Sequence, residues 1–186
     1  RPTLISVPES LASRAPASVS TQAYVGRVLL DLSRIEEISE RIVTVSPDVS
    51  VSTNLGGWIN KVGVYGREEE LDYGGEDEVL SWRVGPKGQH IELGISEMNL
   101  FLLLGQLGMV EHYHSTPLFP IGTLYDPFVI RGLEGMLYGT YSGSKFIVLG
   151  TPSGLSLSRE GGAHQSTITP GIGISLPGVL YAEPTY

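Results

Sequence analysis

The chain has 186 residues and carries 20 acidic against 12 basic side chains, which gives a formal net charge of -8 at pH 7. This length suits one domain with a single sizeable core, and the lack of clustered Lys and Arg argues against nucleic-acid binding, which needs basic patches that contact phosphates. Because the chain has no cysteine, disulfides and thiolate metal sites are excluded, and a cytoplasmic location is favoured.

The N-terminal part predicts an irregular tail followed by an amphipathic helix. Residues 1–19 are rich in Pro, Ser and Ala without periodicity, which is typical of a linker. Ser20 or Thr21 can cap the helix that follows, because a side-chain oxygen there accepts a hydrogen bond from the first turn. The apolar face of this helix comprises Val25, Val28, Leu29, Leu32 and Ile35. The domain is therefore expected to span residues 20–186.

A short buried strand and an acidic stretch come next. The β-branched run from Ile42 to Val45 is ended by Pro47, which is the pattern of a short strand. The loop that follows this strand carries Asp48. Residues 67–78 are strongly acidic with a Gly-Gly break, and they predict a solvated excursion to which no chemistry is assigned.

The second half of the chain alternates strands with helices. Its longest apolar run, residues 100–110, is shorter than the roughly 20 residues needed to cross a bilayer, so a buried helix and no membrane contact are expected. The expected elements are strands at 90–94, 117–125, 145–151 and 178–184, and helices at 97–109 and 127–142. Such alternation predicts an α/β fold, with parallel strands joined by right-handed crossovers and helices on both faces of the sheet.

Side chains suited to chemistry lie where the expected strands end, and parallel sheets bind ligands at those strand ends. Glu97 begins one helix, Tyr125, Phe128 and Arg131 cross a second junction, and His164 lies in a Gly-rich loop after a third strand. Each also has a purely structural explanation. The acid can be a partner for the helix dipole, the aromatics can be core residues, and the histidine can be a surface residue.

These segments, taken in order, resemble a known family. "GISE" at 94–97, "YDPFVIR" at 125–131 and "EGGAHQS" at 160–166 are similar to the pyrimidine-binding domain of thiamine diphosphate enzymes of the transketolase superfamily. With "SPDVSVSTNLGGW" and "ISLPGVLYAEP" added, residues 20–186 look most like the homodimeric E1 components of 2-oxo acid dehydrogenases, pyruvate dehydrogenase above all. The resemblance implies the three-layer α/β/α sandwich around a mainly parallel sheet that is typical of such domains.

The resemblance implies a catalytic role for two residues. In this family the residue that matches Glu97 hydrogen-bonds a ring nitrogen of the cofactor's aminopyrimidine, which promotes removal of the proton from the thiazolium carbon. The residue that matches His164 binds or protonates an oxygen of the reacting substrate, a role suited to a group that titrates near neutrality.

The resemblance also implies a set of cofactor-binding residues. Phe128 matches an aromatic residue that packs on the pyrimidine ring, and Tyr125 and Arg131 complete a motif of Tyr, two residues, Phe, two residues, Arg. Asp48, in "SPDVS", aligns with an acid near the thiazolium ring in relatives. These four residues are therefore the candidates for direct contact with the cofactor.

The implied cofactors are thiamine diphosphate and Mg²⁺, with the Mg²⁺ ligands outside this chain. In the superfamily a Gly-Asp-Gly segment and a later Asn hold Mg²⁺ through oxygen ligands, and this sequence contains no Gly-Asp-Gly. His112 and His114 lack a third ligand of obvious spacing, so no metal site is expected within the chain. The chain is therefore expected to be a fragment of a longer enzyme that forms half of an active site.

The resemblance implies oxidative decarboxylation of a 2-oxo acid, and it implies that the fragment alone is inactive. The expected partners are a diphosphate-binding domain of the same or the opposite subunit, a second copy in a homodimer, and the acyltransferase (E2) component. The expected location is the cytoplasm, or the mitochondrial matrix if the source is eukaryotic. One alternative is transketolase, although transketolases have Gly-Pro-Thr-His-Gln where residues 161–165 are Gly-Gly-Ala-His-Gln. The other is a non-catalytic assembly domain with the same fold.

Overall fold

A six-stranded sheet forms the centre of the computed structural model, which describes residues 9–11, 17–69, 82–155 and 161–184. The strand order is β3-β2-β4-β1-β5-β6, and all paired strands are parallel. The strands are β1 (Ile42–Ser46), β2 (Val64–Tyr65), β3 (Val84–Gly85), β4 (His90–Glu92), β5 (Phe119–Leu124) and β6 (Ile147–Gly150). The sheet confirms the α/β fold that the alternating pattern predicts.

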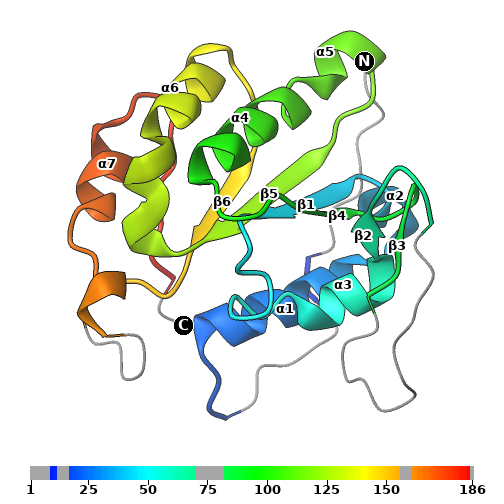
Figure 1. Ribbon diagram of the computed structural model, residues 1–186, viewed down its shortest axis with the longest axis horizontal. Helices are drawn as coiled ribbons and strands as arrows, with labels where there is room; N and C mark the ends of the chain where they lie inside the picture. Colours follow the sequence, from blue (N-terminus) through cyan, green and yellow to red (C-terminus); the bar gives the residue numbers. More distant parts are fainter. Residues whose placement is uncertain (1–8, 12–16, 70–81, 156–160, 185–186) are drawn as a thin grey trace.

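Helices cover both faces of the sheet, which confirms the three-layer arrangement (Figure 1). α1 (Thr21–Leu32) and α3 (Gly56–Val62) pack on one face, and α4 (Glu97–Leu107) and α6 (Leu133–Tyr141) pack on the other. The shorter helices are α2 (Glu36–Ser39), α5 (Val110–His114), the 3-10 helices η1 (Asp126–Gly132) and η2 (Gly162–His164), and α7 (Thr169–Ser175).

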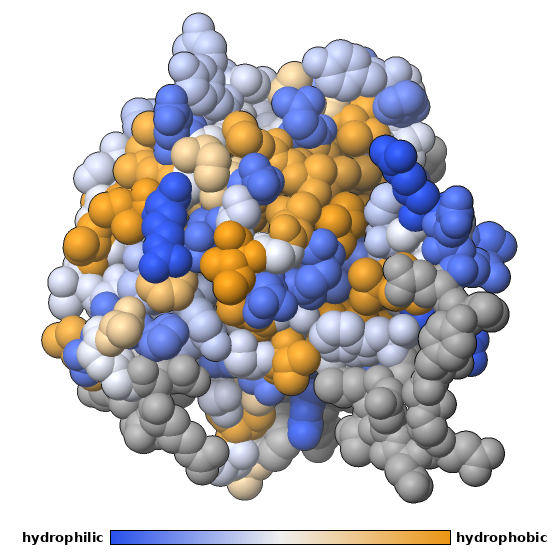
Figure 2. Space-filling model, in the orientation of Figure 1, coloured by the Kyte–Doolittle hydropathy of each residue, from blue (hydrophilic) through white to orange (hydrophobic). Residues whose placement is uncertain are grey.

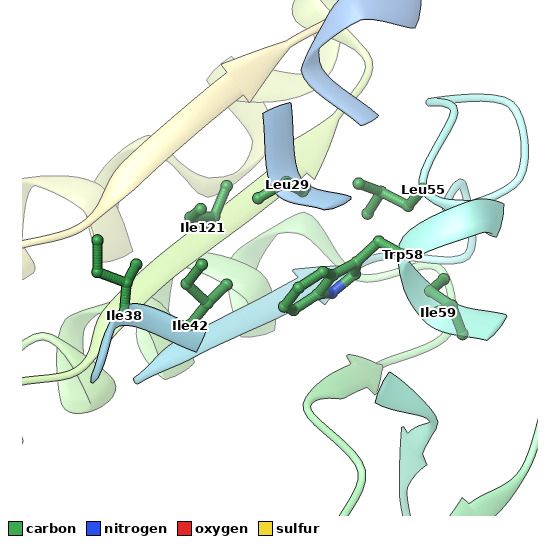
Figure 3. Packing of buried hydrophobic residues seen from close by; sticks show 7 residues of the cluster. All are labelled: Leu29, Ile38, Ile42, Leu55, Trp58, Ile59 and Ile121. Atoms are coloured by element: carbon green, nitrogen blue, oxygen red, sulfur yellow. The ribbon is translucent and has the colours of Figure 1, made fainter. Parts of the chain in front are cut away.

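Two apolar clusters join these layers, and their burial is the main source of stability. The first fills the space between the sheet, α1 and α3, where Trp58 of α3 points toward β1 (Figure 3). Its buried members are Leu29, Ile38, Ile42, Leu55, Trp58, Ile59 and Ile121. The second lies on the α4 side of the sheet, and its buried members are Val45, Leu100, Phe101, Leu104, Leu124, Val129 and Met136.

Serine caps fix where α1 and α4 begin. Ser20 Oγ accepts a hydrogen bond from the backbone N–H of Ala23 at 3.1 Å, so Ser20 is the cap, one of the two that the sequence allows, and α1 begins at Thr21. Ser96 Oγ accepts a longer bond of 3.4 Å from the N–H of Asn99. Because an N-cap side chain replaces a missing helical hydrogen bond, the Ser96 cap places the next residue in the first turn of α4, at the end of β4.

The expected strand at 178–184 is wrong, because these residues form no strand. α7, which was not expected, precedes them in the chain. Val179 packs against the second apolar cluster, and the ring of Tyr181 lies directly over Gly173 of α7. Val179 and Tyr181 therefore pack on the α4 side of the molecule while Leu180 is exposed, and the segment does not add a seventh strand to the sheet.

Other differences from the sequence expectations are smaller. The helix expected at 97–109 ends at Leu107, and α5 follows as a separate helix. The helix expected at 127–142 begins as the 3-10 helix η1. β2 and β3 were not expected, because two residues are too few for an alternating pattern. Most of the expected acidic excursion, from residue 70 onward, and residues 1–8 and 12–16 of the expected tail lie outside the described residues. The domain boundary at residue 20 stays a prediction.

Candidate active site

Glu97 lies in the first turn of α4, at the edge of the sheet where the parallel strands end. The residue is buried, with 7% of its surface exposed. Its Oε1 accepts a hydrogen bond from Nη1 of Arg131 in η1, 3.1 Å away. The N-terminal end of the helix dipole is a second source of positive potential. These partners orient the Glu97 carboxylate. They shield its charge from solvent only partly, because the Arg131 side chain is 52% exposed.

Phe128 lies beneath the guanidinium group of Arg131. The guanidinium carbon is 3.7 Å from the centre of the Phe128 ring, which is within the range of a cation–π interaction. Both residues belong to η1, and Tyr125 occupies the N-cap position of that helix. A 3-10 helix has three residues per turn, so side chains three positions apart lie on one side of it. The three-residue spacing seen in the sequence therefore becomes one continuous face.

His164 completes an aromatic cluster with Tyr125 and Phe128. The ring centre of His164 lies 4.8 Å from that of Tyr125 and 5.6 Å from that of Phe128, and the Tyr125 and Phe128 ring centres are 6.0 Å apart. The Tyr125 ring meets each of the other two edge to face, an arrangement that is favourable for aromatic pairs. We refer to Tyr125, Phe128 and His164 as the aromatic cluster. It connects through Arg131 to Glu97.

The loop after β1 reaches the aromatic cluster through Ser52, which sequence reasoning missed. The hydroxyl of Tyr125 donates a hydrogen bond to Ser52 Oγ at 2.8 Å. The neighbouring Thr53 donates to Thr123 of β5 at 3.2 Å, so this loop is tied to the strand that leads into the site. A hydroxyl residue in a loop has no pattern that marks it as functional, and no sequence signal could have identified Ser52.

Asp48 lies apart from the aromatic cluster. It is exposed and has a φ of 67°, which is the left-handed region that few residues other than glycine adopt. Together with Glu92 and Trp82 it lines a neighbouring hollow at the ends of β1 and β4. The structure therefore brings five of the six candidate residues into one connected group and places Asp48 beside that group.

A buried histidine and its glutamate partner also escaped sequence reasoning. His90 is 0% exposed, and its Nε2 lies 2.9 Å from Oε2 of Glu92. Burial would raise the pKa of Glu92, but hydrogen bonds from His90, Ser50 and the backbone of Asp48 outweigh it and hold that pKa below its ordinary value. The signal was present in "HIELG", where the two side chains lie two positions apart and so on the same face of a strand.

Asp126 is a fourth residue that sequence reasoning did not single out. It follows Tyr125 and is buried, and its Oδ2 has no hydrogen-bond partner among the described residues. Burial raises the pKa of Asp126, an effect that hydrogen bonds from Ser166 and Thr169 oppose and that the charge of Glu183 strengthens. The backbone oxygen of Asp126 accepts a hydrogen bond from Thr169 Oγ1 at 3.0 Å. Asp126 therefore connects η1 with the segment that follows His164.

This arrangement can hold a flat, nitrogen-containing aromatic ring. The aromatic cluster provides ring surfaces, and Glu97 provides a buried oxygen that can exchange a hydrogen bond or a proton with a ring nitrogen. The described residues contain no group of three or more His, Cys, Asp or Glu side chains that could hold a metal ion. Within the same residues, no helix is long and apolar enough to span a membrane.

Comparisons with known proteins found one family model and several curated relatives. Residues 9–186 match a family model described as the pyruvate dehydrogenase E1 component middle domain. A pyruvate dehydrogenase E1 component from Pseudomonas aeruginosa is 25% identical over 170 residues, which are 90% of this chain and 19% of that protein. One from Mycolicibacterium smegmatis is 27% identical over 155 residues, or 82% of this chain and 17% of that protein. The chain thus spans about a fifth of the length of these relatives.

Proposed function

Because the chain belongs to the pyruvate dehydrogenase E1 component middle domain family, we propose that it forms the pyrimidine-binding half of a thiamine diphosphate site in a longer 2-oxo acid dehydrogenase. The proposal includes the domain division: residues 20–186 are the pyrimidine-binding domain, and residues 1–19 are a linker. The relatives carry the name of an enzyme, and their length leaves room for the other half of the site.

One observation carries the proposal, namely the link from Glu97 through Arg131 to the aromatic cluster. A protonated or hydrogen-bonded carboxyl group beside aromatic rings is suited to an aminopyrimidine, which is flat and has ring nitrogens at its edge. Glu97 is buried, and its partner Arg131 is exposed enough to move. The residues present therefore fit the pyrimidine part of the cofactor.

Each residue of the site has a defined task under this proposal. Thiamine diphosphate supplies the nucleophilic carbon and accepts the electrons that decarboxylation of the 2-oxo acid releases. Glu97 holds or moves a proton at a pyrimidine nitrogen, and Phe128 and Tyr125 orient the ring. His164 holds a proton for a substrate oxygen. Arg131 neutralises the charge of Glu97 before the cofactor enters.

The proposal requires partners that supply the rest of the site. Mg²⁺ and the diphosphate would be held by a second domain of the same or the opposite subunit in a homodimer, and the acyltransferase (E2) component would take the product in the cytoplasm or the mitochondrial matrix. Apolar side chains gather on the surface around α4 (Figure 2). Among those of α4 and α6, the exposed ones are Leu102, Leu137, Tyr138 and Tyr141. Such a surface supports contact with another domain or subunit.

The test is an assay of the full-length enzyme with a panel of 2-oxo acids and ketose phosphates, each with and without thiamine diphosphate and Mg²⁺. We expect cofactor-dependent decarboxylation of a 2-oxo acid. Glu97→Gln keeps the volume but removes the carboxylic acid, so the rate should fall by about 10²- to 10⁴-fold, the usual contribution of a proton-transfer group.

Glu134→Gln is the matched control, because Glu134 is also an acid in a first helical turn but is exposed on α6. It should leave the rate unchanged. Ketol transfer from a ketose phosphate without decarboxylation would replace the proposal with a transketolase. A protein that neither binds the cofactor nor turns over either substrate class would be an assembly domain.

A further inference from the structure

A line of buried hydrogen bonds crosses the sheet toward the candidate site. Nε1 of Trp58 donates to Thr44 Oγ1 at 2.9 Å, and Thr44 Oγ1 lies 2.8 Å from Nδ1 of His90. Nε2 of His90 lies 2.9 Å from Oε2 of Glu92. Trp58, Thr44 and His90 are fully buried. The line exists because the parallel register of β1 and β4 places Thr44 beside His90.

The chemistry of its members fixes the direction of this line at both of its ends. An indole N–H can only donate, so the Thr44 oxygen accepts it. A carboxylate can only accept, and the pKa of Glu92 is held below its ordinary value, so Nε2 of His90 donates to Glu92.

Glu92 uses its second oxygen to hold the loop after β1. Oε1 accepts the backbone N–H of Asp48 at 2.7 Å, at the residue whose φ lies in the left-handed region. Four positions later, Ser52 is bound by the hydroxyl of Tyr125. The loop is thus fixed at one end by Glu92 and at the other by the aromatic cluster.

We propose that His90 and Glu92 are positioning residues, which hold the loop 47–55 in the conformation that presents Asp48 and Ser52 to the site. The benefit for cofactor binding rests on the function proposed above, whereas the conformation of the loop does not. The depressed pKa of Glu92 supports the proposal, because a carboxylate that stays charged at neutral pH accepts both hydrogen bonds.

Two substitutions of His90 separate positioning from simple packing. In His90→Gln the side-chain amide nitrogen replaces Nε2 and still donates to Glu92, whereas in His90→Asn the shorter amide reaches only toward Thr44. Glu92→Ala removes the acceptor altogether. Each variant is made in the full-length protein without cofactor, and hydrogen–deuterium exchange is measured by mass spectrometry for peptides that cover residues 47–55, with peptides from α1 and α4 as internal controls.

We expect amide exchange in 47–55 to accelerate by about tenfold or more in Glu92→Ala and His90→Asn, with α1 and α4 unchanged, because the loop opens locally. His90→Gln should stay within about threefold of wild type, which would be rescue by the donor alone. Equal exchange in His90→Asn and His90→Gln would overturn the proposal, whether both are slow or both are fast.

A kinetic measurement then tests the link to the site. The KM for thiamine diphosphate should rise about tenfold in Glu92→Ala and His90→Asn while kcat at saturating cofactor stays within a few-fold, since the variants change positioning and not chemistry. An unchanged KM with an opened loop would overturn the role in cofactor binding. If the wild-type enzyme shows no thiamine diphosphate activity, the proposed function fails, and the exchange contrast alone still decides whether His90 and Glu92 position the loop.

Discussion

Arg131 joins the charged and the aromatic parts of the candidate site at the scale of single residues. Its guanidinium group both pairs with Glu97 and covers the ring of Phe128. Because the Arg131 side chain is half exposed, the ion pair contributes little to stability, about 0–1 kcal/mol. Its value lies in orientation, since a planar guanidinium on an aromatic face has few alternative positions. A lysine at this position would keep the charge and lose that constraint.

Asp126 gives a pH-dependent prediction at the same scale. Its pKa in the folded state is raised above the ordinary value of 3.8, chiefly by burial. For a carboxyl with a raised pKa, the folded state binds the proton more readily than the unfolded state. The protonated Asp126 carboxyl therefore stabilises the folded state fully below pH 3.8, and this contribution to the free energy of unfolding is lost as the pH rises through the folded-state pKa. Asp126→Asn cannot ionise, so the stability of the variant relative to wild type should increase across that window.

The measurement is the urea midpoint of both proteins from about pH 3 to about pH 7. Glu134→Gln, which removes an exposed carboxylate, is the control for the change in net charge. Parallel profiles for wild type and Asp126→Asn would contradict the prediction, because they would mean that folding does not change the proton affinity of Asp126.

At the scale of elements, the close approach of η1 to α4 places the two halves of the site. Gly132, the last residue of η1, leaves no room for a side chain, since a Cβ there would lie 2.2 Å from the ring of Phe101 and 2.6 Å from the backbone oxygen of Glu97. The turn of α4 that carries Glu97 can pack on η1 only because residue 132 is glycine.

Gly132→Ala should therefore destabilise the protein by about 1–3 kcal/mol, the usual cost of overpacking. It should also displace Glu97 from Arg131, because the added methyl group presses on the Glu97 backbone. Chemical denaturation measures the first effect, and the second is measured as the loss of cofactor-dependent rate in the full-length enzyme.

Gly171→Ala is the matched control for Gly132→Ala. Gly171 lies in α7, and a Cβ there would meet no atom within 4 Å. Alanine in a helix is more favourable than glycine, so this variant should gain about 0.5–1 kcal/mol. If both variants shift stability in the same direction, the close contact between η1 and α4 does not limit residue 132.

At the scale of the whole molecule, the chain spans about a fifth of the length of its curated relatives, and the proposed half-site predicts weak cofactor binding by this chain alone. The charge-assisted bonds from Mg²⁺ and the diphosphate would be missing, and several kcal/mol of binding free energy with them. Calorimetric titration of the isolated chain with thiamine diphosphate and Mg²⁺ should give a Kd weaker than about 1 μM.

The full-length enzyme is the control in that titration, and it should bind more tightly by a factor that reflects the missing contacts. Micromolar or tighter binding by the monomeric chain would contradict the division of the site between two domains. It would also show that contacts to the pyrimidine suffice for affinity.

The sequence by itself determined the layers of the fold and the local position of most candidate residues. Alternating apolar patterns report which face of each element is buried, and cap residues report where helices begin, since both depend on neighbours in the chain. For that reason α1 begins next to one of its two expected caps, Ser20, and Glu97 begins α4 as expected. The resemblance carried by the three strand-end motifs then made Phe128 and His164 candidates, and the structure places their ring centres 5.6 Å apart.

Only the tertiary structure decided which of these side chains meet. Arg131 reaches Glu97 across two elements, His90 meets Thr44 through the register of β1 and β4, and the segment from residue 178 packs on α7 instead of joining the sheet. Strand order, register and the covering of exposed edges come from burial summed over the whole chain. A pattern along the chain records that a residue is buried, but it does not record against which partner.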